Sequence, residues 1–226
     1  MSSSETTFPG IRACIFDMDG LLINTEDLNT KCTNDLLQKY GRPVYPNKMR
    51  AHTMGLPISR VQWKRDLHDL SLLSYSDCQP LLGAEKLLSA LSHARVATSG
   101  IEIKRALASG TMRDTYELKV FGPRVRKLID IFPQERRMLG VDPRIQGGRN
   151  KLAPDIYLAA LQSLNSTLRS EEKNIMPNDA GRRAGMRVIW VSHPQLANEY
   201  QSVEKFILAG RSGRIQSGDD GQVGDR

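Results

Sequence analysis

The chain has 226 residues, the size of one domain or of one domain that carries an insert. Hydrophobic residues make up 39% and charged residues 25%, the balance of an ordinary globular protein. No apolar run approaches the roughly 18 residues that cross a bilayer, and the first ten residues contain neither a basic region nor an apolar stretch. We therefore expect no membrane span, no secretory signal and a cytoplasmic location.

Charge and cysteine content narrow the choice of partners. The net charge of +7 could attract nucleic acid, but the cations stand in small scattered groups, and aromatic residues are 6% of the chain, too few for a stacking platform. The three cysteines, Cys14, Cys32 and Cys78, form no CxxC pair, so neither a zinc site nor a disulfide framework is expected. We predict no nucleic-acid partner and a reducing compartment.

The first elements in chain order are a strand and a group of helices. Residues 11–16 form a short apolar run that ends in acids, which is typical of a buried strand in a parallel sheet. A helix is predicted from Thr25 to about residue 40, where Gly41 stops it. Further helical patterns cover residues 59–73 and 82–91. We predict that residues 24–83 are a helical insert.

The second half of the chain returns to strands that alternate with helices. Strands are predicted at residues 103–108, where Arg105 interrupts the apolar run, and at residues 187–191. Between them, helices are predicted over residues 112–120 and from Pro154 onward. This alternation predicts an α/β fold with a parallel sheet. The core would comprise residues 8–23 and 84–200, and the Gly-rich, polar tail, residues 201–226, is expected to be disordered.

Two carboxylates, Asp17 and Asp19, directly follow the first predicted strand. The carboxyl ends of strands are where open α/β sheets bind ligands. Such a pair suits Mg²⁺, and it also suits chemistry in which one carboxylate attacks phosphorus and the other moves a proton. Asp and Gly are equally common in solvated turns, so the pair alone leaves both interpretations open.

Four segments in order extend this pattern: FDMDGLLINTE, which contains both aspartates; ALASGT, with Ser109; GRNKLAPDIYLAAL, with Lys151; and AGRRAGMRVIWV. Together they resemble the motifs of haloacid dehalogenase-like (HAD-like) hydrolases. They are most similar to the helical-cap branch that includes β-phosphoglucomutase and pseudouridine-5′-phosphate phosphatase. The resemblance extends from Ile11 to Val191. It implies a Rossmann-like parallel sheet with an inserted helical cap.

The resemblance also implies an activity, namely Mg²⁺-dependent hydrolysis of a small phosphate monoester through an aspartyl-phosphate. Asp17 would be the nucleophile and a metal ligand, and Asp19 the general acid/base with its backbone carbonyl on the metal. Ser109 and Gly110 would bind the substrate phosphate, and Lys151 would neutralise the transferring group. Phosphatase action is favoured over mutase action, the partner would be a small phosphorylated metabolite, and the protein would be a monomer.

The position of the phosphate-binding hydroxyl has one alternative. Thr98 in VATSG also follows a short apolar stretch. Ser109 is preferred because the apolar triplet ALA precedes it and a predicted helix follows it.

One part of the family pattern has no counterpart in this chain. The family carries a late apolar strand that ends in two acids and completes the magnesium shell. Here the corresponding segment is SEEKNIMPNDAGRRAGM, in which Ile175 and Met176 are too few for a strand. Asp179 is the nearest acid and the remaining candidate ligand. Two functions stay open, an active phosphatase and a catalytically impaired or truncated product that keeps the fold without the full metal site.

Overall fold

The computed structural model describes residues 11–48, 63–96, 99–145 and 154–166, together with residues 189 and 191. The chain divides into two compact units. The first comprises residues 1–44 and 57–190, and the second comprises residues 45–56 and 191–226. All the helices and strands discussed below belong to the first unit.

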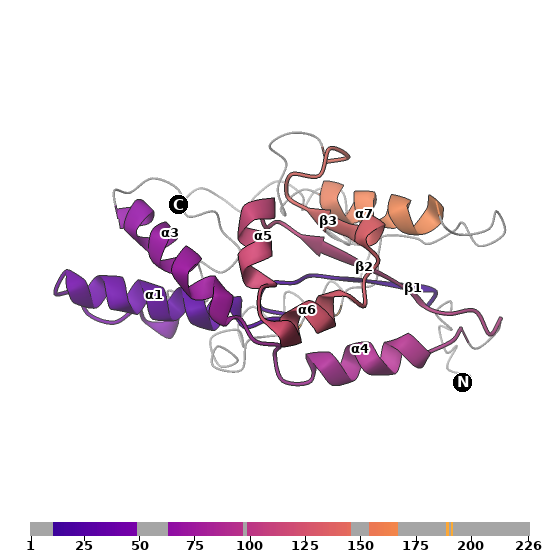
Figure 1. Cartoon of the computed structure of the whole chain (residues 1–226), viewed down its shortest axis with the longest axis horizontal. Coiled ribbons are helices and arrows are strands. Elements are labelled where there is room, and N and C mark those ends of the chain that lie inside the picture. The colour runs from indigo at the N-terminus through magenta and orange to yellow at the C-terminus, as the bar shows by residue number, and fades with distance from the viewer. Residues whose placement is uncertain are drawn as a thin grey trace, which may run out of the picture. The chain divides into compact units, whose positions relative to one another are not determined.

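A three-stranded parallel sheet forms the centre of this unit (Figure 1). Its strands are β1 (Ala13–Phe16), β2 (Lys104–Ser109) and β3 (Arg137–Leu139), in the order β1-β2-β3. Phe16 pairs with Leu107, and Ser109 pairs with Leu139. The predicted α/β class with a parallel sheet is therefore confirmed, and the first two predicted strands form neighbouring strands of it.

The sheet buries side chains on both faces, as expected for parallel strands. Ala106, Ala108 and Met138 pack against helix α7 (Asp155–Ser166). Side chains alternate between faces along a strand, so Leu107 lies on the opposite face, where it packs with Phe16 and with Phe132.

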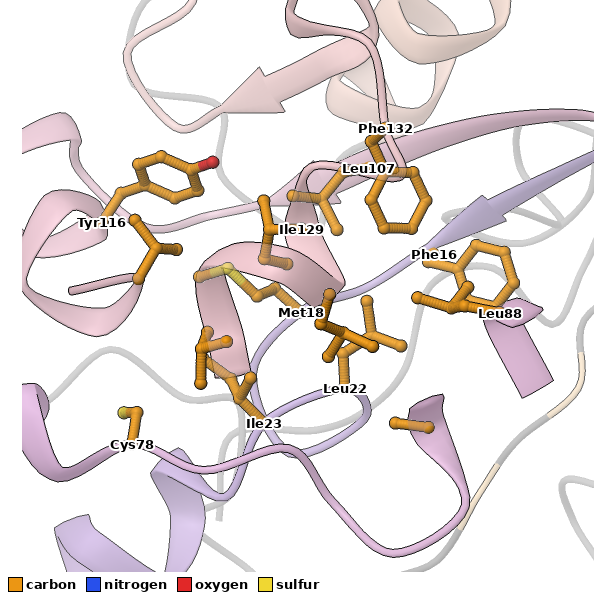
Figure 2. Close-up of a cluster of buried hydrophobic side chains, with 14 of the residues drawn as sticks. Phe16, Met18, Leu22, Ile23, Cys78, Leu88, Leu107, Tyr116, Ile129 and Phe132 are labelled. Carbon is orange, nitrogen blue, oxygen red and sulfur yellow. The ribbon is translucent and has the colours of Figure 1, made fainter. Parts of the chain in front are cut away.

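Helices α4 (Ala84–His93) and α6 (Pro123–Ile129) cover this second face. They contribute the fully buried Leu88 and Ile129 to the larger apolar cluster, which Figure 2 shows around Phe16, Met18 and Leu107. The rings of Phe16 and Phe132 lie 5.7 Å apart in a tilted arrangement. Core packing thus anchors the chain immediately before and after the end of β1.

Five of the described helices, α1, α3, α4, α5 and α7, lie where the sequence patterns predict helices and differ from the predictions at their ends; residues 59–62 of the predicted helix 59–73 lie outside the described residues. Helix α1 spans Thr25–Lys39, α3 spans Trp63–Ser74 and α5 spans Arg113–Lys119. Among the described residues, one helix and one strand were not predicted, namely α6 and β3. Strand β3 has three residues, and its sequence Arg-Met-Leu is too short to show alternation. Helix α6 begins with Gly122-Pro123, a start signal that is present in the sequence.

Helices α1 and α3 lie in the predicted insert and pack against each other. Their contact is built from Cys32, Leu36 and Leu67, all of which are buried. Two 3₁₀ turns complete the described elements, η1 (Tyr75–Asp77) after α3 and η2 (Gln134–Arg136) before β3.

Arg105, expected to be out of place in a buried strand, has polar partners for part of its guanidinium. Its Nη2 lies 2.7 Å from Glu102 Oε1, and its Nη1 donates to the carbonyl of Leu91 at 2.9 Å. The charge is thereby compensated beside the start of β2. Of the strand predicted at residues 187–191, Ile189 and Val191 are described; both are exposed and neither lies in a strand. The prediction of a buried strand is therefore wrong at these two residues, and residues 187, 188 and 190 lie outside the described residues.

Among the described residues, no helix is both long and apolar enough to cross a membrane. The predicted tail, residues 201–226, lies outside the described residues.

The carboxyl ends of β2 and β3 approach each other closely at Gly140. A Cβ atom at this position would lie 2.5 Å from the carbonyl oxygen of Gly110, and the Gly140 amide donates to the carbonyl of Thr111 at 3.0 Å. Backbone atoms cannot rotate away as a flexible side chain can. The absence of a side chain at Gly140 therefore sets the position of the loop that follows Ser109.

We expect Gly140→Ala to lower the free energy of unfolding by about 1–3 kcal/mol, because the added methyl group overpacks against backbone. Urea unfolding followed by circular dichroism measures this change. Gly122→Ala is the comparison: its Cβ would lie 3.6 Å from the nearest atom, an ordinary contact, at a φ of −63°, so it should lose only the smaller contribution of a helix N-cap glycine. Equal stabilities for Gly140→Ala and Gly122→Ala would show that the strand ends are not held this tightly.

Candidate active site

The two aspartates of the first motif flank a buried residue at the end of β1. Met18 has no exposed surface and belongs to the apolar cluster of Figure 2, whereas Asp17 and Asp19 are only partly buried. The Met18 amide donates to Asp17 Oδ1 at 2.6 Å. Burial of Met18 thus anchors the segment and leaves both carboxylates outside the core.

A tight turn follows Asp19. The carbonyl of Met18 accepts hydrogen bonds from the amides of Leu22 at 2.9 Å and Ile23 at 3.2 Å. Gly20 has a φ of +70°, and a Cβ there would lie 2.8 Å from the Glu26 side chain. Both conditions favour glycine at this position. The turn returns the chain to helix α1, and Leu22 and Ile23 are buried beneath it.

The Asp19 carboxylate lies at the centre of a polar network. Its Oδ2 accepts hydrogen bonds from Ser109 Oγ at 3.0 Å and from Thr111 Oγ1 at 2.7 Å. Its Oδ1 lies 2.6 Å from Lys119 Nζ, which also donates to Thr111 Oγ1 at 3.0 Å. The side chains of Lys119 and Asp19 are 7% and 19% exposed, so this ion pair is largely shielded from water. Both carboxylate oxygens of Asp19 therefore have protein donors.

The structure brings together four of the predicted site residues. Ser109 is the fully buried last residue of β2, and Gly110 follows it directly. Because β1 and β2 are parallel neighbours, Ser109 and Gly110 lie beside the strand end that carries Asp17 and Asp19. The other predicted residues, Lys151 and Asp179, lie outside the described residues, as does the alternative Thr98.

Two residues that contact Asp19, Thr111 and Lys119, were not predicted from the sequence. Lys119 is the last residue of α5, and a lysine near a helix end is usually solvated, so its sequence position carried no signal. The structure buries it because α5 packs against η1, which places Tyr75 over the amine. The sequence did contain a signal for Thr111, because it is a second hydroxyl residue only two positions after Ser109, in the loop that lies beside Asp19.

Three nearby protic side chains are held in their neutral forms. Burial and the negative charge of Asp19 raise the pKa of Tyr75 to about 12. Burial, opposed by Lys119, raises the pKa of the Cys78 thiol to about 12. Burial and the negative charge of Asp17 raise the pKa of Tyr157, on α7, to about 12. At neutral pH Cys78 is thus a thiol rather than a nucleophilic thiolate.

The described residues fit a magnesium ion in part. The Asp17 carboxylate and the backbone carbonyl of Asp19 are oxygen donors of the kind that Mg²⁺ prefers. The Asp19 side chain is occupied by Lys119, Ser109 and Thr111, which agrees with a metal contact through its carbonyl alone. No group of three or more His, Cys, Asp or Glu side chains that could hold a metal occurs among the described residues.

Comparison with known proteins defines the class. The family model for haloacid dehalogenase-like hydrolases matches residues 14–72, which contain the Asp17-Asp19 turn and helix α1. A protein of Drosophila melanogaster, described as a probable pseudouridine-5′-phosphatase, is 30% identical over 217 residues, which cover 87% of this chain and 88% of that protein. The chain belongs to the haloacid dehalogenase-like hydrolases.

More similarities extend over most of the chain. A Saccharomyces cerevisiae protein, also described as a probable pseudouridine-5′-phosphatase, is 28% identical, and the match covers 92% of this chain and 93% of that protein. (DL)-glycerol-3-phosphatase 2 of Arabidopsis thaliana is 27% identical over 86% of this chain and 85% of its own. A haloacid dehalogenase-like protein of unknown function from Agrobacterium tumefaciens has the same fold, with a TM-score of 0.60, 20% identity and coverage of 89% of this chain and 100% of that chain.

Proposed function

We propose that this chain is a Mg²⁺-dependent phosphatase that hydrolyses a small phosphate monoester through an aspartyl-phosphate on Asp17. The observation that carries the proposal is the arrangement at the carboxyl ends of β1 and β2, where two aspartates lie beside a buried serine hydroxyl. Relatives described as phosphatases support the reaction class.

The proposed reaction has two steps. An oxygen of Asp17 attacks phosphorus, the ester P–O bond breaks, and the leaving oxygen takes the bonding electron pair together with the proton of Asp19, which enters this step as the protonated carboxyl group. Water then attacks phosphorus, Asp19 accepts a proton from that water, and inorganic phosphate and the free Asp17 carboxylate are released. Asp19 therefore acts first as the acid and then as the base.

The remaining proposed residues stabilise charge on the phosphoryl group. Ser109 would exchange its hydrogen bond to Asp19 for one to a phosphate oxygen, and Gly110 would present its backbone there. Lys151 would neutralise the transferring group. Asp17 and the carbonyl of Asp19, with Asp179 as a further candidate, would hold Mg²⁺, which supplies electrostatic stabilisation of the phosphoryl oxygens.

The substrate would be chosen by the cap, for which we propose residues 24–83. The packed helices α1 and α3 belong to this segment. The relatives' descriptions as pseudouridine-5′-phosphatase and glycerol-3-phosphatase favour a sugar-type or polyol phosphate, a small phosphorylated metabolite. The monomeric state, the cytoplasmic location and the absence of a nucleic-acid partner stay predictions.

The test is phosphate release by the purified chain from pseudouridine 5′-phosphate, glycerol 3-phosphate and p-nitrophenyl phosphate. We expect turnover that EDTA lowers by about 100-fold or more and that added Mg²⁺ restores. Circular dichroism in EDTA controls for unfolding. A folded sample that releases no phosphate from any of the three would contradict the proposal and favour a chain that keeps the fold without the full metal site.

A further inference from the structure

The polar network around Asp19 includes Lys119, a residue that has no role in the reaction steps proposed above. Lys119 ends a seven-residue helix, yet it is buried and its amine contacts three residues outside that helix, Asp19, Thr111 and Tyr75. A buried ammonium is costly unless it is paired and its orientation is held, so its surroundings indicate what it does.

Each contact of Lys119 restrains the position of its amine. Nζ lies 2.6 Å from Asp19 Oδ1 and 3.0 Å from Thr111 Oγ1, and Thr111 in turn donates to the other oxygen of Asp19 at 2.7 Å. The Tyr75 ring covers Nζ, with its centroid 4.7 Å away. Lys119 and Thr111 together therefore contact both carboxylate oxygens of Asp19 and limit the rotation of this group.

The Tyr75 side chain, which covers the amine of Lys119, is itself held by a hydrogen bond. The Tyr75 hydroxyl donates to Asn29 Oδ1 on α1 at 3.0 Å. Tyr75 therefore has a fixed partner at its hydroxyl and lies against Lys119 through its ring face. Residues of η1 and α1 thus restrain the amine of Lys119, which contacts Asp19.

We propose that Lys119 is a positioning residue: it keeps Oδ1 of Asp19 in place, so that Oδ2, which Ser109 releases when it turns to the phosphate, carries the proton that is transferred to the leaving oxygen. This inference rests on the proposed phosphatase function. Lys119 acts through Asp19 and does not contact the substrate. Substitution of Lys119 would therefore slow the hydrolysis of a substrate more strongly when its leaving group needs the proton from Asp19.

The leaving group provides the readout. An alkoxide, as from glycerol 3-phosphate, needs a proton when the P–O bond breaks, whereas p-nitrophenolate leaves without one. A positioning role for Asp19 predicts that Lys119→Met lowers kcat/KM by about 100-fold for the alkyl phosphate and by a few-fold for the aryl phosphate. A residue that is needed for folding alone would lower both values by the same factor.

A double-mutant cycle shows whether the effect passes through Asp19. In an Asp19→Asn background we expect Lys119→Met to leave the alkyl-to-aryl ratio of kcat/KM unchanged, because the carboxyl group it positions is gone. The matched control is Lys127→Met, which makes the same change at an exposed lysine on α6. It should have the same alkyl-to-aryl ratio of kcat/KM as the unaltered protein. If Lys119→Met does not fold, Thr111→Val tests the same network, and its ratio should shift in the same direction.

The outcomes separate the two proposals. Turnover in the unaltered protein that disappears in Asp17→Asn, together with a ratio that shifts in Lys119→Met or Thr111→Val, supports the role of Lys119. The same turnover with an unshifted ratio in the folded variants overturns the positioning role alone. A folded, unaltered protein without Asp17-dependent turnover overturns the phosphatase proposal, and the role of Lys119 with it.

Discussion

Asp17→Asn is expected to lower the hydrolysis of every phosphate monoester by about 10⁴-fold or more, because an amide cannot form the aspartyl-phosphate. The residue lies directly after β1 and is held by the Met18 amide, 2.6 Å from Oδ1. An asparagine Oδ1 can accept the same hydrogen bond, so the local fold should persist. The measurement is kcat/KM for glycerol 3-phosphate and p-nitrophenyl phosphate, with thermal unfolding to confirm a folded sample.

The control for this variant is Asp114→Asn, which makes the same chemical change at an exposed position in the first turn of α5. It should retain the activity of the unaltered chain. The proposed nucleophile would be wrong if Asp17→Asn, purified in the same way, kept more than a small fraction of the turnover of the unaltered chain.

Asp19→Asn has the second largest expected effect, a decrease in kcat/KM of about 10²–10⁴-fold for an alkyl phosphate. The amide cannot supply the proton that the leaving alkoxide needs. For p-nitrophenyl phosphate the decrease should be much smaller, because that leaving group needs no proton. The ratio of the two values therefore identifies Asp19 as the acid, and equal decreases for both substrates would contradict this role.

Asp19→Asn also has a structural cost, because it removes the partner of a largely buried amine. We expect the free energy of unfolding to fall by up to about 3 kcal/mol, since breaking one side of a buried pair leaves a charge uncompensated. The double variant Asp19→Asn with Lys119→Met removes both charges and should regain much of that stability while staying inactive toward the alkyl phosphate. Urea unfolding of the three proteins separates this loss of stability from the loss of the acid.

The elements near the site differ in how far the sequence predicted them. The run at residues 11–16 is apolar, short and closed by acids, and it forms β1, Ala13–Phe16. The predicted strand at 103–108 forms β2, Lys104–Ser109, so Ser109 lies where the pattern placed it. These predictions hold because the positions that a parallel strand buries, such as residues 106–108 of β2, form an apolar run that is visible in a few consecutive residues.

Elements whose signal is weak or distant were not predicted. Strand β3 has three residues, too few for any periodicity, and its position depends on pairing with β2 through Leu107 and Ser109. Gly140 shows the same limit, since its reason for lacking a side chain is the carbonyl of Gly110, thirty residues earlier in the chain. Such contacts are set by strand packing and leave no mark on neighbouring residues.

By itself, the sequence determined the α/β class, the end of β1 with its two aspartates and the hydroxyl that closes β2. Each of these is a local pattern, in which neighbouring residues and backbone preferences are sufficient. Only the tertiary structure decided that Lys119 and Thr111 contact the Asp19 carboxylate. Lys119 is 100 residues from Asp19 in the chain, and its amine is buried because β2, α5 and η1 bring Thr111 and the Tyr75 ring around it. Folding thus converted a lysine that its own helix would leave in water into a buried partner of the proposed acid.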